Sequence, residues 1–202
     1  MKYTQIPETT FKNLQLNAGI LLSAFIPSTG ELEADDILGA TSGGVNFTAT
    51  PTYSDWGEDV DNCPVNVKEL KKLDSWAVLM SGTFVTVTTA LAKTLVGAAD
   101  IGGSGATKVT PRNDILTTDF TDLWWVGDYS DVNEDGTSTG KAGFVAIHMI
   151  NGLSTGGFQI QSGNRAKGQF AFEFTGHYSI EDQSKVPFEV YIQAGTAEAA
   201  GG

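Results

Sequence analysis

The chain of 202 residues contains little cysteine, histidine or positive charge. Its single cysteine, Cys63, excludes an internal disulfide. Two histidines are too few for most metal or acid–base sites unless carboxylates converge on them. The 12 Lys and Arg residues stand against 24 Asp and Glu residues, which gives a net charge of −12. That balance disfavours binding to the outside of duplex nucleic acid, where neutralisation of phosphates dominates affinity.

Long apolar runs are also missing. No segment approaches the roughly 18 apolar residues of a membrane-spanning helix, and Met1–Gln5 leads into no apolar core of a signal peptide. We therefore expect no membrane partner and synthesis in a reducing cytoplasm. The 24 glycines are dispersed without a period, which excludes a collagen-like fibre.

Apolar side chains that recur at every second position indicate β-strands. Phe170, Phe172 and Phe174 alternate with polar or small residues, as in a half-buried strand. Residues 158–161 repeat the pattern upstream and predict a hairpin with this strand. Residues 188–192 repeat it downstream, so three strands are expected to share one apolar face of an antiparallel sheet.

The remaining strands are expected near residues 18–26, 44–50, 75–88, 123–129 and 143–150. A short helix at about 89–97 is predicted by a Thr cap, apolar residues one turn apart and a terminal glycine. We predict a mainly β fold, a two-sheet antiparallel β-sandwich with one short α-helix. The single domain would span 18–193 with a long loop at 53–67, between an N-terminal arm (1–17) and a flexible C-terminal tail (194–202).

Two short motifs partly match known functional sites, a calcium-binding loop and a catalytic serine, but each lacks a required feature. Asp131, Asn133 and Asp135 match the opening of an EF-hand calcium loop, but Ala142 stands where a bidentate Glu is required. A solvated hairpin loop is the favoured interpretation there. Ser154 lies in a Gly-x-Ser-x-Gly pattern, yet a strand rather than a helix is expected after it, which disfavours a nucleophile elbow. We predict no catalytic residue, no cofactor and no enzymatic activity.

Trp124 and Trp125 are neighbours on one predicted strand, so their side chains point to opposite faces. One is expected in the core and the other at a surface, where an indole can stack on a sugar or a base. Together with the Asp131 loop, this pair defines an alternative function, a carbohydrate- or surface-binding β-sandwich module.

Most of the chain resembles the major tail proteins, or tail tube proteins, of long-tailed bacteriophages. The resemblance rests on four stretches: Gly43-Gly44-Val45-Asn46-Phe47 entering a strand, the acidic loop 55–66, the segment Lys68-Glu69-Leu70-Lys71-Lys72, and the terminal strands between Phe170 and Ile192. It implies a β-sandwich with one helix that assembles into six-membered rings, which stack into a hollow tube.

The same resemblance implies partners and a location. The partners would be further copies of the chain, a tape measure protein and other tail proteins, and DNA would pass through the tube without specific binding. The location would be the virion, after synthesis in the cytoplasm of a bacterial host.

The resemblance also implies which residues make contacts. The long loop and terminal arm are expected to form subunit interfaces, with Phe11, Trp56, Asp59, Asp61 and Val65 as candidates. The polar face of the terminal strands is expected to line the lumen, with Gln169, Glu173 and Glu189 as candidates. An acidic lumen would repel phosphates, so that DNA passes without sticking.

Overall fold

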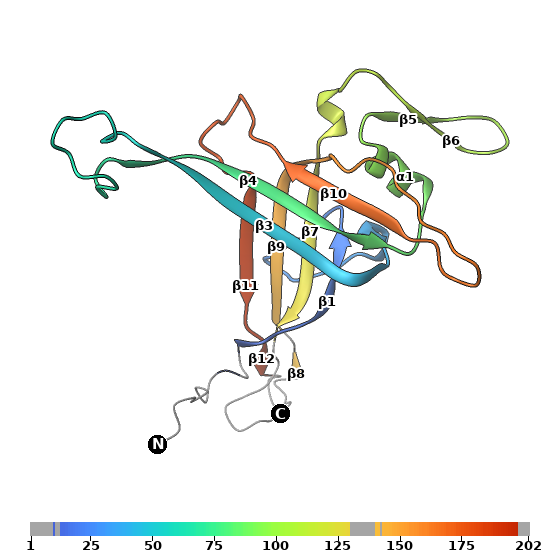
Figure 1. Ribbon diagram of the computed structural model, residues 1–202. Coiled ribbons are helices and arrows are strands. Elements are labelled where there is room, and N and C mark those ends of the chain that lie inside the picture. The colour runs from blue at the N-terminus through green and yellow to red at the C-terminus, as the bar shows by residue number, and fades with distance from the viewer. Residues whose placement is uncertain (1–9, 11–12, 130–139, 142, 198–202) are drawn as a thin grey trace.

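A computed structural model describes residue 10 and residues 13–129, 140–141 and 143–197 (Figure 1). The chain is mainly β, as predicted, and its largest element is an eight-stranded antiparallel sheet. Its strand order is β2-β1-β7-β9-β10-β4-β3, with β11 added to β9. The strands are β1 (Gln15–Leu22), β2 (Ile37–Gly39), β3 (Thr41–Asp55), β4 (Lys71–Phe84), β7 (Thr121–Tyr129), β9 (Gly143–Ser154), β10 (Phe170–Gly176) and β11 (Phe188–Gln193).

Smaller elements surround this sheet. Two short ribbons form from β5 (Ala99–Gly102) with β6 (Lys108–Pro111) and from β8 (Gly140–Lys141) with β12 (Thr196–Ala197). One α-helix, α1 (Thr89–Val96), and the 3-10 turns η2 (Ala34–Asp36) and η3 (Thr117–Asp119) complete the named elements of the described residues.

Strand β9 divides the main sheet into two halves. One edge of β9 pairs with β7, while the other pairs with β11 over residues 144–149 and with β10 over residues 152–154. The half made of β3, β4 and β10 therefore lies across the half made of β11, β9, β7 and β1 (Figure 1). The hydrogen bonding is continuous from one half to the other, so in the described part of the chain the two halves belong to one sheet, and the expected two-sheet sandwich is not confirmed.

The main core lies between these halves. Phe172 and Phe174 of β10 are buried with Phe84 of β4, and the rings of Phe84 and Phe172 lie 4.6 Å apart. Leu123 and Met149 complete this core from β7 and β9. Burial of side chains of this size contributes about 1.5–3 kcal/mol each. The alternation predicted over residues 170–174 is thus confirmed.

Two other expectations for the terminal strands are wrong. Residues 158–161 form no strand with β10, and only Gln161 pairs with Gln169 in an isolated bridge. Strand β11 joins β9 rather than β10 and extends past the crossing half (Figure 1). Val190 and Ile192 therefore remain 51% and 65% exposed instead of packing with the phenylalanines of β10.

The ends of several elements also differ from the prediction. Helix α1 has its predicted cap, since the Thr88 hydroxyl accepts a hydrogen bond from the Leu91 amide at 3.1 Å. Residues 15–17, expected in the arm, begin β1, and Thr196–Ala197, expected in the tail, form β12. Residues 53–55, expected in the long loop, complete β3, so the connection to β4 spans 56–70.

A bulge in β1 accommodates a tryptophan. Pairing with β7 becomes irregular between Leu16 and Ile20, and the indole Nε1 of Trp125 donates to the Ala18 carbonyl at 3.0 Å. Gly19 has a φ of +68°, and a Cβ at this position would lie 2.5 Å from the indole ring. Only glycine fits both the backbone conformation and the space.

Replacement of Gly19 tests this packing. We expect Gly19→Ala to lower the free energy of unfolding by about 2–4 kcal/mol, because a left-handed backbone penalty adds to a clash with Trp125. The control is Gly44→Ala, whose φ of +82° carries the same kind of penalty but whose Cβ would meet no atom within 4 Å. Urea unfolding of both variants measures the difference, and equal losses would contradict a tight fit at Gly19.

Candidate assembly surfaces

Strands β3 and β4 project beyond the rest of the sheet as a hairpin arm, which we define as residues 50–77. The third strand of this half, β10, ends its pairing with β4 at Gly176, opposite Val78. Beyond that point β3 and β4 continue to pair with each other as far as Asp55 and Lys71. Figure 1 shows the arm reaching out of the body of the molecule, with the connection 56–70 at its tip. No other described strand pairs with the arm.

One carboxylate organises the tip. Asp55 accepts hydrogen bonds from the Gly57 amide at 2.9 Å and the Asn66 amide at 2.8 Å. The side chain of Lys71 donates to the Asn66 side-chain oxygen at 3.1 Å. The amide of Gly57, followed by that of Asn66, lowers the pKa of Asp55. The carboxylate thereby ties the start of the connection to Asn66, which lies eleven residues beyond Asp55 in sequence.

The arm exposes apolar side chains that the molecule itself leaves uncovered. Trp56 is 61% exposed and Val65 is 74% exposed, while Tyr53 and Leu73 are each about half exposed on the paired strands. The ammonium of Lys72 lies 3.5 Å from the centre of the Trp56 ring, a cation–π contact that orients the indole. Exposed apolar groups that cluster on a projecting element are typical of an interaction surface.

Four of the five predicted interface residues lie together on this tip: Trp56, Asp59, Asp61 and Val65 are all exposed there. Phe11 lies outside the described residues. Tyr53 and Leu73 belong to the same surface and were missed, because the sequence prediction ended the strand before residue 53 and began the next at residue 75. The Lys71-Lys72 pair opposite the acidic segment was the available signal for an earlier start of β4.

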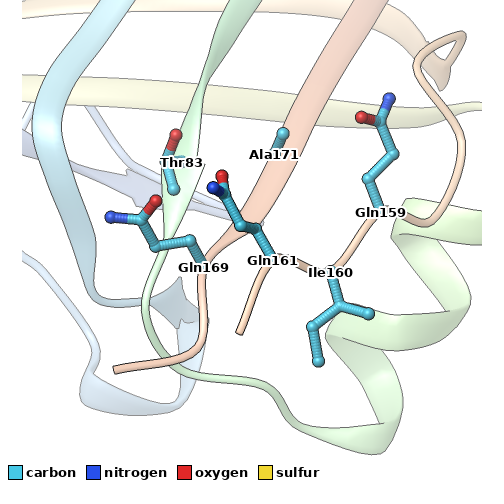
Figure 2. A pocket seen from close by; sticks show the side chains of 6 residues that line it. All are labelled: Thr83, Gln159, Ile160, Gln161, Gln169 and Ala171. Atoms are coloured by element: carbon cyan, nitrogen blue, oxygen red, sulfur yellow. The ribbon is translucent and has the colours of Figure 1, made fainter. Parts of the chain in front are cut away.

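The predicted lumen residues divide between two faces. Glu173 and Ala171 point away from the core, since their neighbours Phe172 and Phe174 are buried in it. Gln169 is exposed beside them, where Figure 2 shows it next to Thr83 and Ala171. Glu173 pairs with Ser81 of β4, which pairs in turn with Asn46 of β3. Thr175 likewise pairs with Leu79, which pairs with Thr48. This face is therefore rich in small polar groups, and Glu173 is the acid among these positions.

Glu189 belongs to the opposite face. Its neighbour Phe188 packs against Phe47 and Trp76 in the core, so Glu189 points outward from the other half of the sheet. There its carboxylate accepts a 2.5 Å hydrogen bond from the Tyr191 hydroxyl, which lowers the pKa of Glu189. Because the two halves enclose one core, the grouping of Glu189 with Gln169 and Glu173 on one surface is wrong.

Both tryptophans of the alternative site are buried. Trp125 belongs to the main core, and Trp124 packs in a second cluster with Phe25 and Val126 on the outer face of β7. Their exposed fractions are only 9% and 8%, so the expected surface tryptophan is absent from this strand. The His148 ring stacks on Trp124 at 3.9 Å, where a sugar would have to bind.

Other chemical candidates are occupied by structural roles or lie outside the described residues. The Ser154 hydroxyl donates to the Leu95 carbonyl at 2.7 Å and ends β9 against helix α1. His177 pairs with Asn151 at the end of β10. Asp131, Asn133 and Asp135 are not among the described residues. Within the described ranges, no three His, Cys, Asp or Glu side chains converge as a metal site.

Comparison with known proteins identifies no relative of this chain. No protein-family model matches the chain, and no curated protein sequence is similar to it. No helix in the described part of the chain is both long and apolar enough to cross a bilayer.

Protonation of Asp55 tests the organisation of the tip. The pKa of Asp55 is lowered, so the ionised carboxylate keeps its two hydrogen bonds from the Gly57 and Asn66 amides above about pH 4. These hydrogen bonds stabilise the tip there and weaken as pH falls through the folded-state pKa. We expect the amide proton resonances of Gly57 and Asn66 to move upfield together below pH 4. Asp55→Asn should abolish that joint titration, and unchanged titration of both amides in this variant would contradict the assignment.

Proposed function

We propose that this chain is a structural subunit that assembles with its own copies into stacked hexameric rings, forming the hollow tail tube of a bacteriophage. The observation that carries the proposal is the hairpin arm, which holds Trp56, Val65 and Leu73 in contact with solvent. Burial of that apolar area against a neighbouring copy would stabilise the assembly by about 25 cal/mol per Å² before the costs of association.

Unpaired sheet edges support the same function. Strands β3 and β11 are edge strands of the main sheet within the described residues. Long exposed edges favour pairing with strands of other chains. Val190 and Ile192 are exposed on β11, which adds apolar area to one of these edges. A subunit whose edges continue into those of its neighbours is the arrangement that a tube wall requires.

The outward face of β3, β4 and β10 suits the lumen. Its Asn, Ser and Thr side chains are polar, and Glu173 supplies negative charge. Such a surface stays hydrated, and residues 44–50, 77–83 and 169–175 include no Lys or Arg that could bind a passing phosphate backbone. The two crossing halves would then act as the layers of the sandwich that the resemblance to tail tube proteins implies. Tape measure and other tail proteins would be the further partners, and the virion the location.

Truncation of Trp56 tests the role of the arm. We expect Trp56→Ala to raise the protein concentration needed for tube formation by about tenfold or more, as for the loss of an interface aromatic. Circular dichroism should show an unchanged monomer, because the ring is 61% exposed. Ile180→Ala, which truncates an 87% exposed side chain on another loop, is the control. Electron microscopy of concentrated protein provides the readout. If Trp56→Ala forms intact tubes at the same protein concentration as the wild type, the arm has no role in assembly.

Charge reversal on the two outward faces tests the lumen. We expect virions built with Glu173→Lys to assemble normally but to release DNA slowly, because a ring of cations would retain phosphates. Glu189→Lys makes the same change on the opposite face and should leave DNA release unaffected. Infectivity per assembled particle measures both. Equal infectivity of Glu173→Lys and wild-type particles would place the lumen elsewhere.

A further inference from the structure

The half-sheet of β3, β4 and β10 carries opposite charges at its two ends. One end is the tip of the hairpin arm, with Glu58, Asp59 and Asp61 close together in sequence. The other is the loop 162–168 before β10, with Arg165 and Lys167. Figure 1 places these ends on opposite sides of the molecule, joined by the long strands between them.

The basic end stands out in an acidic protein. Residues 151–172 contain no Asp or Glu, so Arg165 and Lys167 are the charged residues of that stretch. Both side chains are exposed, and no carboxylate of the described residues lies within ion-pair distance of either. A turn holds the loop, in which the Ala166 amide donates to the Gly163 carbonyl at 3.2 Å.

The three acids at the tip likewise form no ion pair among the described residues, because the lysines beside them contact other groups. Lys68 pairs with Glu69 at 3.4 Å, Lys71 binds the Asn66 side chain, and Lys72 lies over Trp56. Among the described residues, no cation lies within 4 Å of the carboxylates of the three acids at the tip.

Both ends also expose apolar groups. The tip offers Trp56 and Val65, and the basic end offers Phe158 and Ile160, which are 44% and 61% exposed. A hollow of about 130 Å³ opens beside Ile160, where Gln161 and Gln169 approach Thr83 (Figure 2). Apolar groups ringed by charge are typical of protein interfaces, in which the charges fix partner and orientation.

We infer that the acidic tip of one copy docks on the basic loop of the next, so that Glu58, Asp59 and Asp61 face Arg165 and Lys167 of that copy. The occupant is a second copy of this chain because each end carries the complement of the other, and the two ends are too far apart to meet within one molecule. This is a head-to-tail contact, which closes into a ring or continues as a filament according to its rotation. The inference rests on the proposed self-assembly and specifies its contact.

Charge reversal at either end tests the pairing. We expect Arg165→Glu/Lys167→Glu and, separately, Glu58→Lys/Asp59→Lys each to raise the critical concentration for assembly at least about tenfold, because like charges then face each other. Lys108→Glu/Lys185→Glu changes the net charge as the first variant does, but outside residues 56–70 and 162–168, and should shift the critical concentration less than about twofold. Light scattering and sedimentation measure assembly, with circular dichroism and melting temperature as checks on folding.

Mixing gives the decisive result. An equimolar mixture of the two reversed variants should assemble near the wild-type concentration, because the basic tip of one matches the acidic loop of the other. A single chain with all four substitutions should do so as well. The pairing is overturned, and the proposed function stands, if wild-type protein assembles and neither reversal raises the critical concentration. The same conclusion follows if neither the mixture nor the chain with four substitutions recovers assembly. Wild-type protein that stays monomeric at every concentration overturns both.

Discussion

The hydrogen bonding of β9 is the constraint on which the rest of the fold depends. A strand has two edges, and β9 shares one of them between β11 and β10. Two partners cannot follow one edge in the same direction, so the sheet divides there and β10 carries β3 and β4 across the other half. The apolar faces of the two halves then meet, which is why residues as distant as Leu21 and Phe174 share a core.

The same division explains where unburied surface remains. Strand β10 has seven residues, whereas β3 and β4 have fifteen and fourteen, so part of their hairpin extends past any third strand. Strand β11 extends past the crossing half and leaves Val190 and Ile192 in solvent. These surfaces follow from differences in strand length, and they supply the edges and apolar groups that the proposed assembly uses.

The sequence predicted most strands, the helix and the inward side of β10, because alternation and helix capping are local signals. It misplaced β11 because the pattern of Phe188, Val190 and Ile192 shows that one face is apolar but not which strand that face will meet. The grouping of Glu189 with Glu173 failed for the same reason. Burial of both Trp124 and Trp125 requires cover on both faces of β7, and that cover comes from Phe25 and from β4 and β10, distant in sequence.

The tip residues were predicted because the resemblance to tail tube proteins assigns subunit contacts to the long loop, and loops of this length are usually functional or disordered. At the basic loop the sequence predicts only a hairpin turn, because its two cations become informative only once the fold places them opposite the acidic tip. Charge complementarity between two ends of a molecule depends on the folded shape, so it cannot be predicted from a local stretch of sequence.

The continuity of β4 has a mechanical consequence. Its tip end carries the exposed arm, and its other end lies in the core between β3 and β10, with Val78, Met80 and Phe84 buried. A pull applied to the arm along the strand axis moves β3 and β4 together, so it would load the hydrogen bonds between β4 and β10 in shear, all at once, rather than opening them one after another. A tube built from such subunits would resist stretching through the pairing of β4 with β10.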